Sequence, residues 1–274
     1  PAVRARYVDV DLPVAEARGR RGGDTGAEAG LAERLLEELL AEPGNGVVAW
    51  RGEVRYERHV RRAAATGGGA ASGPLVRAGA TYLITGGFGG IAGVITDWLA
   101  REHQANLVLL ARTPLPARDA WDAWLGEHGS EDSISRAILR VRALEAAGAS
   151  VLPVAADVTV ADQMRDALDA ARERFGGIDG VFHTAGVIRD SLIPLKTQRE
   201  IEDVFSAKVY GTLVLHDLLA KESLDFLCLF SSTSAYVAPQ GQIDYVGANS
   251  FINAFADAHR GGRYPIIALN WGIW

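Results

Sequence analysis

The fold is decided by the stretch Thr85-Gly86-Gly87-Phe88-Gly89-Gly90-Ile91-Ala92, which joins an apolar run at 81–85 to an apolar helical pattern that reaches Leu99. Glycines at the point where a strand turns into a helix let backbone N–H groups approach a pyrophosphate, whose charge the helix N-terminus favours. A glycine-rich string alone is a weak signal. Its position between a strand and a helix indicates a nucleotide-binding turn.

Outward from this turn, short apolar runs alternate with amphipathic segments. The amphipathic segments include 161–175 and 199–220, and an additional helix is predicted near 119–124. Strands are predicted at 81–85, 106–111, 150–155, 180–183, 225–230 and 265–270. Strands that alternate with helices imply crossover units, and therefore a parallel sheet covered on both faces.

The first 65 residues have a different pattern. An extended segment at 4–12 precedes a predicted helix at 27–40, and two short strands follow at 46–51 and 53–58. The helix has leucines at helical spacing on one side: Leu31, Leu35, Leu36, Leu39 and Leu40. Residues 63–73 contain only Ala, Gly, Ser and Thr, the composition of a flexible linker. We therefore predict a first subdomain over 1–65, a linker over 66–79 and a main domain over 80–274.

Composition excludes several function classes. The 274 residues are 48% hydrophobic and 23% charged, as in ordinary globular domains. The formal net charge of -6 argues against a nucleic-acid partner and against an anionic membrane surface. Apolar runs such as 107–111 are too short to span a bilayer. With Cys228 as the only cysteine and no metal-ligand spacing among the histidines, we expect no disulfide, no metal site and a cytoplasmic protein.

The residue after the second predicted strand bears on the choice of cofactor. An acidic residue there would accept hydrogen bonds from the ribose of NAD, whereas Arg112 can pair with a 2′-phosphate. Arg112 therefore favours NADPH, and its alternative role is that of a solvated loop arginine. Asp157 follows the third strand, and it could also be the N-cap of a helix that starts near Val160.

Two spacings resemble the short-chain dehydrogenases/reductases. Gly86, Gly90 and Ala92 match their T-G-x-x-x-G-x-[GA] loop, and Ser232 precedes Tyr245 by their usual thirteen positions. Their usual lysine lies four residues after the tyrosine, where this chain has Asn249, while Lys208 lies upstream.

This exchange of lysine and asparagine resembles the ketoreductase domains of modular polyketide synthases. Further matching segments are His183-Thr184-Ala185-Gly186-Val187, 204–212, 230–232, 241–245 and 270–272. The stretches 186–192 and 232–249 resemble those of trans-acyltransferase and myxobacterial-type synthases. The resemblance covers 80–274 and, more loosely, 1–65.

The resemblance implies a fold, a cofactor and a set of site residues. It implies a Rossmann-like doubly wound parallel sheet, preceded by a truncated, partial Rossmann-like structural subdomain that binds no cofactor. The cofactor would be NADPH, and the catalytic residues would be Tyr245, Ser232, Lys208 and Asn249. The cofactor-binding residues would be Thr85, Gly86, Phe88, Gly89, Gly90, Ile91, Arg112, Asp157, Val158, Ala185 and Gly186.

The residue types fit the chemistry of that family. A free phenol titrates at about pH 10. Because a nearby ammonium stabilises the phenolate, the lysine would make Tyr245 a better proton donor. Ser232 would donate to the same carbonyl oxygen, and Asn249 would hold Lys208 or a linking water. Taken singly, Ser232 could cap a turn, Tyr245 could be a core or surface aromatic residue and Lys208 could be solvated. Their joint spacing favours the catalytic interpretation.

Three positions bear on stereochemistry. B-type ketoreductases carry Leu-Asp-Asp where this chain has Ile188-Arg189-Asp190, so Asp190 retains the last aspartate. A-type domains carry tryptophan where this chain has Val237, and a proline linked to epimerised substrates is replaced by Gly247. The pattern resembles B-type reduction without α-epimerisation, which gives a D-configured hydroxyl. The alternative is that Asp190 only caps a short turn.

The resemblance also implies partners and leaves two rival functions. The substrate would be a β-ketoacyl thioester on an acyl carrier protein, and neighbouring synthase domains would flank the chain, which we expect to be a monomer by itself. Family members continue past the position of Trp274 into a lid region that this sequence lacks. The rivals are a free-standing short-chain alcohol dehydrogenase and an NADPH-binding scaffold or epimerase domain.

Overall fold

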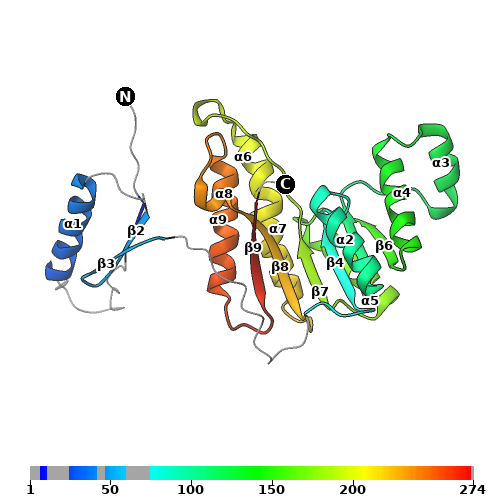
Figure 1. Ribbon diagram of the computed structural model, residues 1–274, viewed down its shortest axis with the longest axis horizontal. Helices are drawn as coiled ribbons and strands as arrows, with labels where there is room; N and C mark the ends of the chain where they lie inside the picture. Colours follow the sequence, from blue (N-terminus) through cyan, green and yellow to red (C-terminus); the bar gives the residue numbers. More distant parts are fainter. Residues whose placement is uncertain (1–6, 11–24, 42–46, 60–74, 273–274) are drawn as a thin grey trace. The chain divides into compact units, whose positions relative to one another are not determined.

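The computed structural model describes residues 7–10, 25–41, 47–59 and 75–272 (Figure 1). The chain divides into two compact units, 1–69 and 70–274. The boundary between them falls in the segment predicted as a linker, of which only 75–79 lie within the described residues. The separate roles of 1–65, 66–79 and 80–274 stay predictions.

The smaller unit contains a helix and three short strands. They are β1 (Tyr7–Val10), α1 (Thr25–Leu40), β2 (Val47–Arg51) and β3 (Val54–Glu57). Strand β1 pairs parallel with β2, and β2 pairs antiparallel with β3. This arrangement agrees with the elements predicted for the first subdomain.

The leucines on one side of α1 do not form a buried face. Leu36, Leu39 and Leu40 are exposed, and over residues 30–40, whose side chains the structure describes, the buried one is Glu38. The Glu38 carboxylate pairs with Arg55 and accepts from Trp50 Nε1 at 3.2 Å. A buried carboxylate needs such donors, so polar contacts join α1 to β2 and β3.

The larger unit is built on a six-stranded sheet in which all neighbouring strands are parallel. The strand order is β6-β5-β4-β7-β8-β9. The strands are β4 (Thr81–Thr85), β5 (Asn106–Ala111), β6 (Ser150–Ala155), β7 (Gly180–His183), β8 (Phe226–Ser232) and β9 (Ile266–Trp271). This is the order of the Rossmann fold, and the direction of winding reverses between β4 and β7. The predicted parallel α/β sheet is confirmed.

Alternation along the strands produces two cores, one on each face of the sheet. Tyr82 and Ile84 face a core that contains residues of α2 (Gly90–His103), α3 (Trp121–His128) and α4 (Ser133–Ala146). Leu83 faces the other core, with residues of α5 (Ala161–Phe175), α7 (Gly211–Leu219) and α9 (Ile243–Ala258). Figure 1 shows these helices on the two sides of the sheet. The structure is therefore doubly wound.

The segment predicted as one helix over 199–220 is interrupted. It consists of α6 (Gln198–Phe205), a π-helical turn (Ser206–Tyr210) and α7. In the π turn the N–H of Gly211 bonds to the carbonyl of Ser206, which is wider than α-helical spacing. Hydrophobic periodicity assumes a regular helix, so it does not reveal the extra residue. The predicted additional helix near 119–124 is found as a 3₁₀ turn (Arg118–Ala120) followed by α3.

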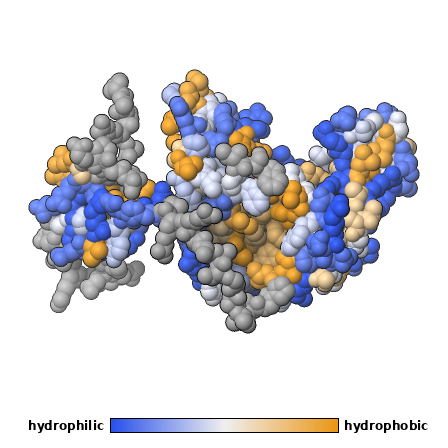
Figure 2. Space-filling model, in the orientation of Figure 1, coloured by the Kyte–Doolittle hydropathy of each residue, from blue (hydrophilic) through white to orange (hydrophobic). Residues whose placement is uncertain are grey.

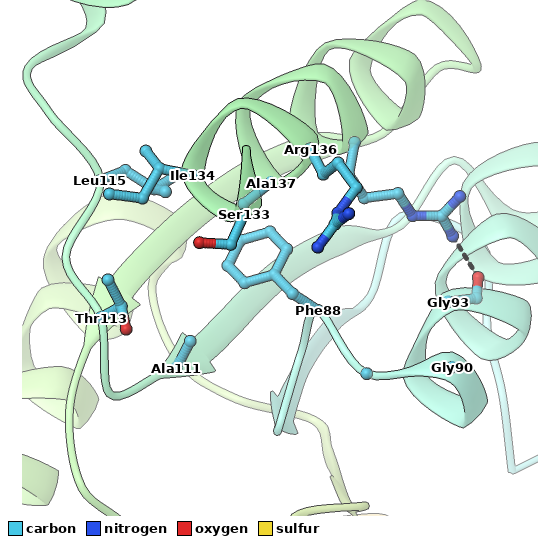
Figure 3. A pocket seen from close by; sticks show the side chains of 12 residues that line it. Phe88, Gly90, Gly93, Ala111, Thr113, Leu115, Ser133, Ile134, Arg136 and Ala137 are labelled. Carbon is cyan, nitrogen blue, oxygen red and sulfur yellow. Dashed lines mark hydrogen bonds between the residues drawn. The ribbon is translucent and has the colours of Figure 1, made fainter. Parts of the chain in front are cut away.

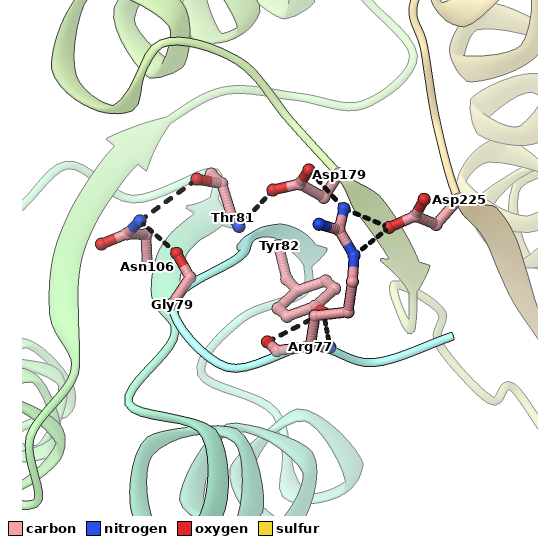
Figure 4. A network of polar contacts seen from close by, with 7 residues as sticks. All are labelled: Arg77, Gly79, Thr81, Tyr82, Asn106, Asp179 and Asp225. Atoms are coloured by element: carbon pink, nitrogen blue, oxygen red, sulfur yellow. Dashed lines mark hydrogen bonds and ion pairs between the residues drawn. The ribbon is translucent and has the colours of Figure 1, made fainter. Parts of the chain in front are cut away.

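A polar network joins the amino ends of three adjacent strands (Figure 4). Arg77 donates to Asp179 at 2.8 Å and to Asp225 at 2.6 Å. Asp179 also accepts from the backbone N–H of Thr81 at 2.7 Å. The network lies at the opposite end of the strands from the glycine-rich turn, so it supports the sheet rather than that turn.

No helix within the described ranges combines the length and the apolar character that crossing a bilayer needs. Hydrophobic residues do gather on the surface in the view of Figure 2, over the middle of the larger unit, where Figure 1 draws β7, β8 and β9.

Gly180 tests the packing of the core. A Cβ at this position would lie 2.7 Å from the Phe226 ring and 3.1 Å from that of Tyr82, and both rings are buried. Gly180→Ala should therefore lower the free energy of unfolding by about 1–3 kcal/mol in urea denaturation. Gly177→Ala is the matched control, because a Cβ there meets nothing within 4 Å. Equal losses in the two variants would contradict this packing.

Candidate active site

The glycine-rich turn lies at the carboxyl end of β4, beside the point where the winding of the sheet reverses. Gly86 has a φ of 64°, and a Cβ there would lie 3.0 Å from the Ala185 backbone. The turn therefore packs closely against the segment that follows β7. Helix α2 begins at Gly90 without a side-chain cap at Gly89, so its first N–H groups are available to an anion.

A cavity of about 600 Å³ opens at this end of the sheet. Nine of the eleven predicted cofactor residues line it: Thr85, Gly86, Phe88, Gly89, Arg112, Asp157, Val158, Ala185 and Gly186. Of the other two, Ile91 packs against the core on one face of the sheet, and Gly90 lines a neighbouring cavity. The loops after β4, β5, β6 and β7 therefore converge on one space that suits a dinucleotide.

The neighbouring cavity, of about 520 Å³, is drawn in Figure 3. Phe88, Gly89, Ala111 and Thr113 line both cavities, and α4 adds residues such as Arg136 to this second one. Sequence reasoning missed this contribution because α4 lies far along the chain from the glycine-rich turn.

Asp157 does not cap a helix. Its Oδ1 accepts from the backbone N–H and the hydroxyl of Thr159, at 2.9 and 2.7 Å, and the N-cap of α5 is Val160. The helix-cap alternative is therefore wrong. The Asp157 carboxylate instead orders its own turn at the edge of the larger cavity.

The π turn places Lys208 beside Tyr245. The Lys208 side chain is buried, its Nζ donates to the Phe230 carbonyl at 2.7 Å, and it lies 5.3 Å from the centroid of the Tyr245 ring. Asn249, one turn after Tyr245 in α9, donates from Nδ2 to the Tyr245 carbonyl at 2.7 Å. Ser232 ends β8 two residues after Phe230, and its hydroxyl accepts from the Ser234 N–H at 3.1 Å.

Two polar groups in this cluster have capacity left for further hydrogen bonds. Asn249 Oδ1 is buried and bonds to no other described residue. A buried acceptor without a donor costs about 1–3 kcal/mol, so a water or an amine donor suits this position. An ammonium has three N–H donors, and the bond to Phe230 uses one of them.

Burial also changes the pKa of this lysine. Loss of solvation lowers the pKa of Lys208 to about 8, so at pH 7 it remains mostly an ammonium. A Cβ at Gly186 would lie 3.0 Å from Lys208 Cε. Glycine at 186 therefore lets the lysine lie directly against the cofactor-side segment.

His183 joins the glycine-rich turn to the lysine turn. Its Nδ1 lies 2.7 Å from Thr85 Oγ1, and its Nε2 lies 2.9 Å from the Ala207 carbonyl. Burial, and then the charge of Lys208, lower its pKa to about 4. The ring is therefore neutral, and Nε2–H donates to the carbonyl while Nδ1 accepts from the threonine hydroxyl. In the sequence His183 is only part of a segment that matches the ketoreductase family, and neither bond was predicted.

The predicted stereocontrol residues lie on exposed segments. Asp190 Oδ2 accepts from Gln242 Nε2 at 3.0 Å, so it bonds to a distant loop rather than within its own turn. Val237 is 71% exposed at the end of the short helix α8 (Ser234–Val237). Among the described residues no group of three His, Cys, Asp or Glu side chains could hold a metal ion.

Comparisons with known proteins agree with this geometry. A family model described as the KR domain matches residues 80–274. One phenolphthiocerol/phthiocerol polyketide synthase protein of Mycobacterium tuberculosis is 36% identical over 241 residues, 87% of this chain and 12% of that protein. The 6-methylsalicylic acid synthase of Aspergillus terreus is 34% identical over 203 residues, 73% of this chain and 11% of that protein.

Solved structures extend the comparison. A ketoreductase domain from the bacillaene assembly line has a TM-score of 0.74 at 25% identity, covering 98% of this chain and 58% of that one. An A-type ketoreductase from a modular polyketide synthase has a TM-score of 0.75 at 27% identity, covering 98% and 51%.

Fold and site together define an oxidoreductase of the short-chain dehydrogenase/reductase superfamily, whose members bind a nicotinamide cofactor. The chain belongs to the KR domain family, the ketoreductase domains of polyketide synthases. It spans only a small part of the synthases that it matches.

The buried neutral His183 should make the fold sensitive to acid. Its folded pKa of about 4 lies below the ordinary value of about 6.5. As the pH falls from 6.5 to 4, the unfolded chain takes up a proton that the folded chain excludes, so stability falls, by up to about 3 kcal/mol. Urea unfolding of the wild type and His183→Asn from pH 7 to pH 4.5 measures this. The variant should lose less stability over that range, and parallel curves would refute the assignment.

Proposed function

We propose that this chain reduces a β-ketoacyl thioester, carried by an acyl carrier protein, to the D-configured β-hydroxyacyl thioester with NADPH. The observation that carries the proposal is the buried Lys208 ammonium 5.3 Å from the centroid of the Tyr245 ring. This pair lies at the same end of the sheet as the dinucleotide-sized cavity. Gly186 links the two, because it lines the cavity and packs against Lys208.

The four predicted catalytic residues have different roles in the proton transfer. When bound, the reduced nicotinamide supplies a hydride to the keto carbon. Tyr245 donates its phenolic proton to the ketone oxygen, and Ser232 donates a hydrogen bond to the same oxygen. The Lys208 ammonium stabilises the phenolate that remains. Asn249, with its buried free acceptor, holds a water or the lysine through which the phenolate regains a proton.

NADPH is proposed over NADH because of Arg112. This exposed arginine lines the cavity immediately after β5, next to Thr113. A guanidinium pairs strongly with a 2′-phosphate, whereas an acidic residue in that place would favour the ribose hydroxyl of NAD.

The substrate and the configuration of the product hydroxyl are inferred from residues on the exposed segments that carry Asp190 and Val237. Asp190 retains one aspartate of the B-type pattern, and Val237 replaces the A-type tryptophan. Exposed apolar side chains on the same segments could receive an acyl or pantetheine arm: Ile188, Leu192, Ile193, Tyr236 and Ile243. The named relatives are synthases, which supports a carrier protein and flanking synthase domains as partners.

Two other functions compete with this one. Loss of Tyr245 or Ser232 would have supported a scaffold or epimerase domain, whereas Tyr245, Ser232, Lys208 and Asn249 are all present. A free-standing alcohol dehydrogenase would ordinarily place its lysine four residues after the tyrosine, where Asn249 lies.

Tyr245→Phe tests the proposed reaction. NADPH oxidation with a 3-oxoacyl N-acetylcysteamine thioester should fall by about 10²- to 10⁴-fold, because the proton donor is lost. Tyr56→Phe is the control, since this tyrosine is exposed on β3 in the other unit. Chiral chromatography of the wild-type product tests the D configuration. Tight NADPH binding without turnover by the wild type would favour the scaffold or epimerase function.

Arg112→Gln tests the cofactor. Loss of a charge-assisted bond of about 1.5–3 kcal/mol should lower the ratio of kcat/KM for NADPH over NADH by roughly 10- to 100-fold. Arg101→Gln provides a control, because this arginine is exposed at the far end of α2. An unchanged ratio in Arg112→Gln would remove the argument for NADPH.

A further inference from the structure

A second buried lysine lies near the site and has no part in the proton chemistry. Lys196 Nζ lies 2.7 Å from Asp244 Oδ2, and the two side chains are only 2% and 1% exposed. Burial of both charges removes their hydration, so a buried ion pair adds little net stability over an apolar pair, and such pairs are best attested as devices that fix register.

The ammonium joins two segments that each carry a site residue. Lys196 Nζ also donates to the carbonyl of Arg189, which immediately precedes Asp190. Asp244 immediately precedes Tyr245, and its Oδ1 accepts from the Tyr245 N–H at 2.9 Å. One charged group therefore connects the backbone next to the predicted stereocontrol aspartate with the backbone next to the predicted proton donor.

Two other contacts link the same segments, and both are weaker. The Ser191 N–H donates to the Gly241 carbonyl at 3.0 Å, and Gln242 Nε2 donates to Asp190 Oδ2 at 3.0 Å. Asp190 is exposed, so water competes for its bond to Gln242. The Lys196–Asp244 bond is buried and charge-assisted, which makes it the stronger constraint.

We propose that Lys196 and Asp244 are positioning residues that hold the segment 188–196 against the first turn of α9. They thereby fix Asp190 relative to the Tyr245 phenol and determine which face of the ketone receives the hydride. This inference rests on the proposed function. Because a small displacement of reacting groups costs up to about 10²-fold in rate, loss of the pair acts on kcat and on product handedness more than on KM.

The test is a double-mutant cycle with Lys196→Met, Asp244→Asn and the double variant. Each single variant leaves one charge buried without its partner and should lower Tm, whereas the double variant leaves none and should be no less stable than either single variant. In all three, kcat with a 3-oxoacyl N-acetylcysteamine thioester should fall roughly 10- to 100-fold. KM should stay within about threefold, and the product should become a mixture of enantiomers.

Arg77→Met is the matched control. It removes an ion-paired cation at the other end of the strands (Figure 4), and it should lower Tm without changing kcat or the enantiomer ratio. This control separates loss of stability from loss of position. If the single variants do not fold, the double variant carries the test.

Two results would overturn the inference. The first is that the folded variants keep the wild-type kcat and enantiomer ratio. The second is that the double variant recovers the wild-type kcat and enantiomer ratio, because the pair would then act only through stability. A readout without turnover distinguishes failure of the inference from failure of the proposed function. Hydrogen exchange of the Ser191 amide, which bonds across the two segments, should accelerate in all three variants and not in Arg77→Met. Unchanged exchange would overturn the inference even if the wild type reduces no ketone.

Discussion

The arrangement of the site depends on one buried cation, the Lys208 ammonium. A lysine that is 5% exposed retains its charge only if the protein replaces part of its lost hydration. The Phe230 carbonyl at 2.7 Å does so, and the Tyr245 ring 5.3 Å away adds its π face. Three elements, the π turn, β8 and α9, must meet for this to happen. The close contact of Gly186 with the lysine then brings in the segment after β7.

The neutral His183 holds the turn that carries this lysine. Its Nε2–H bonds to Ala207, the residue before the lysine, and its Nδ1 accepts from Thr85, the last residue before the glycine-rich turn. A protonated imidazole could not accept from the threonine and would add a second positive charge near the lysine. The glycine-rich turn and the turn that carries Lys208 are therefore held together by a histidine that has to stay uncharged.

Much of the fold and of the candidate site could be predicted from the sequence, because those parts leave local signals. Short stretches of sequence are enough to recognise the glycine-rich turn, the alternation of strands and helices, and the interval from Ser232 to Tyr245. The features that could not be predicted depend on tertiary partners. The leucines of α1 give a helical period, but Glu38 is the buried residue because Arg55 and Trp50 lie opposite it. Likewise, Lys196 and Asp244 are 48 positions apart, and nothing local in either segment predicts that they pair.

The π turn at Ser206–Tyr210 has a consequence for how this helix can change in evolution. A widened turn is what one extra residue leaves in an α-helix, and each residue of an α-helix rotates the following side chains by about 100°. Because the widened turn absorbs this extra residue, α6 keeps its contacts with α9 while α7 keeps its place in the core. Deletion of one residue from the turn would therefore leave the packing of α6 and α7 in place and change the direction of the side chains within the turn, Lys208 among them. The length of this short turn thus sets the position of Lys208 separately from the packing of the two helices.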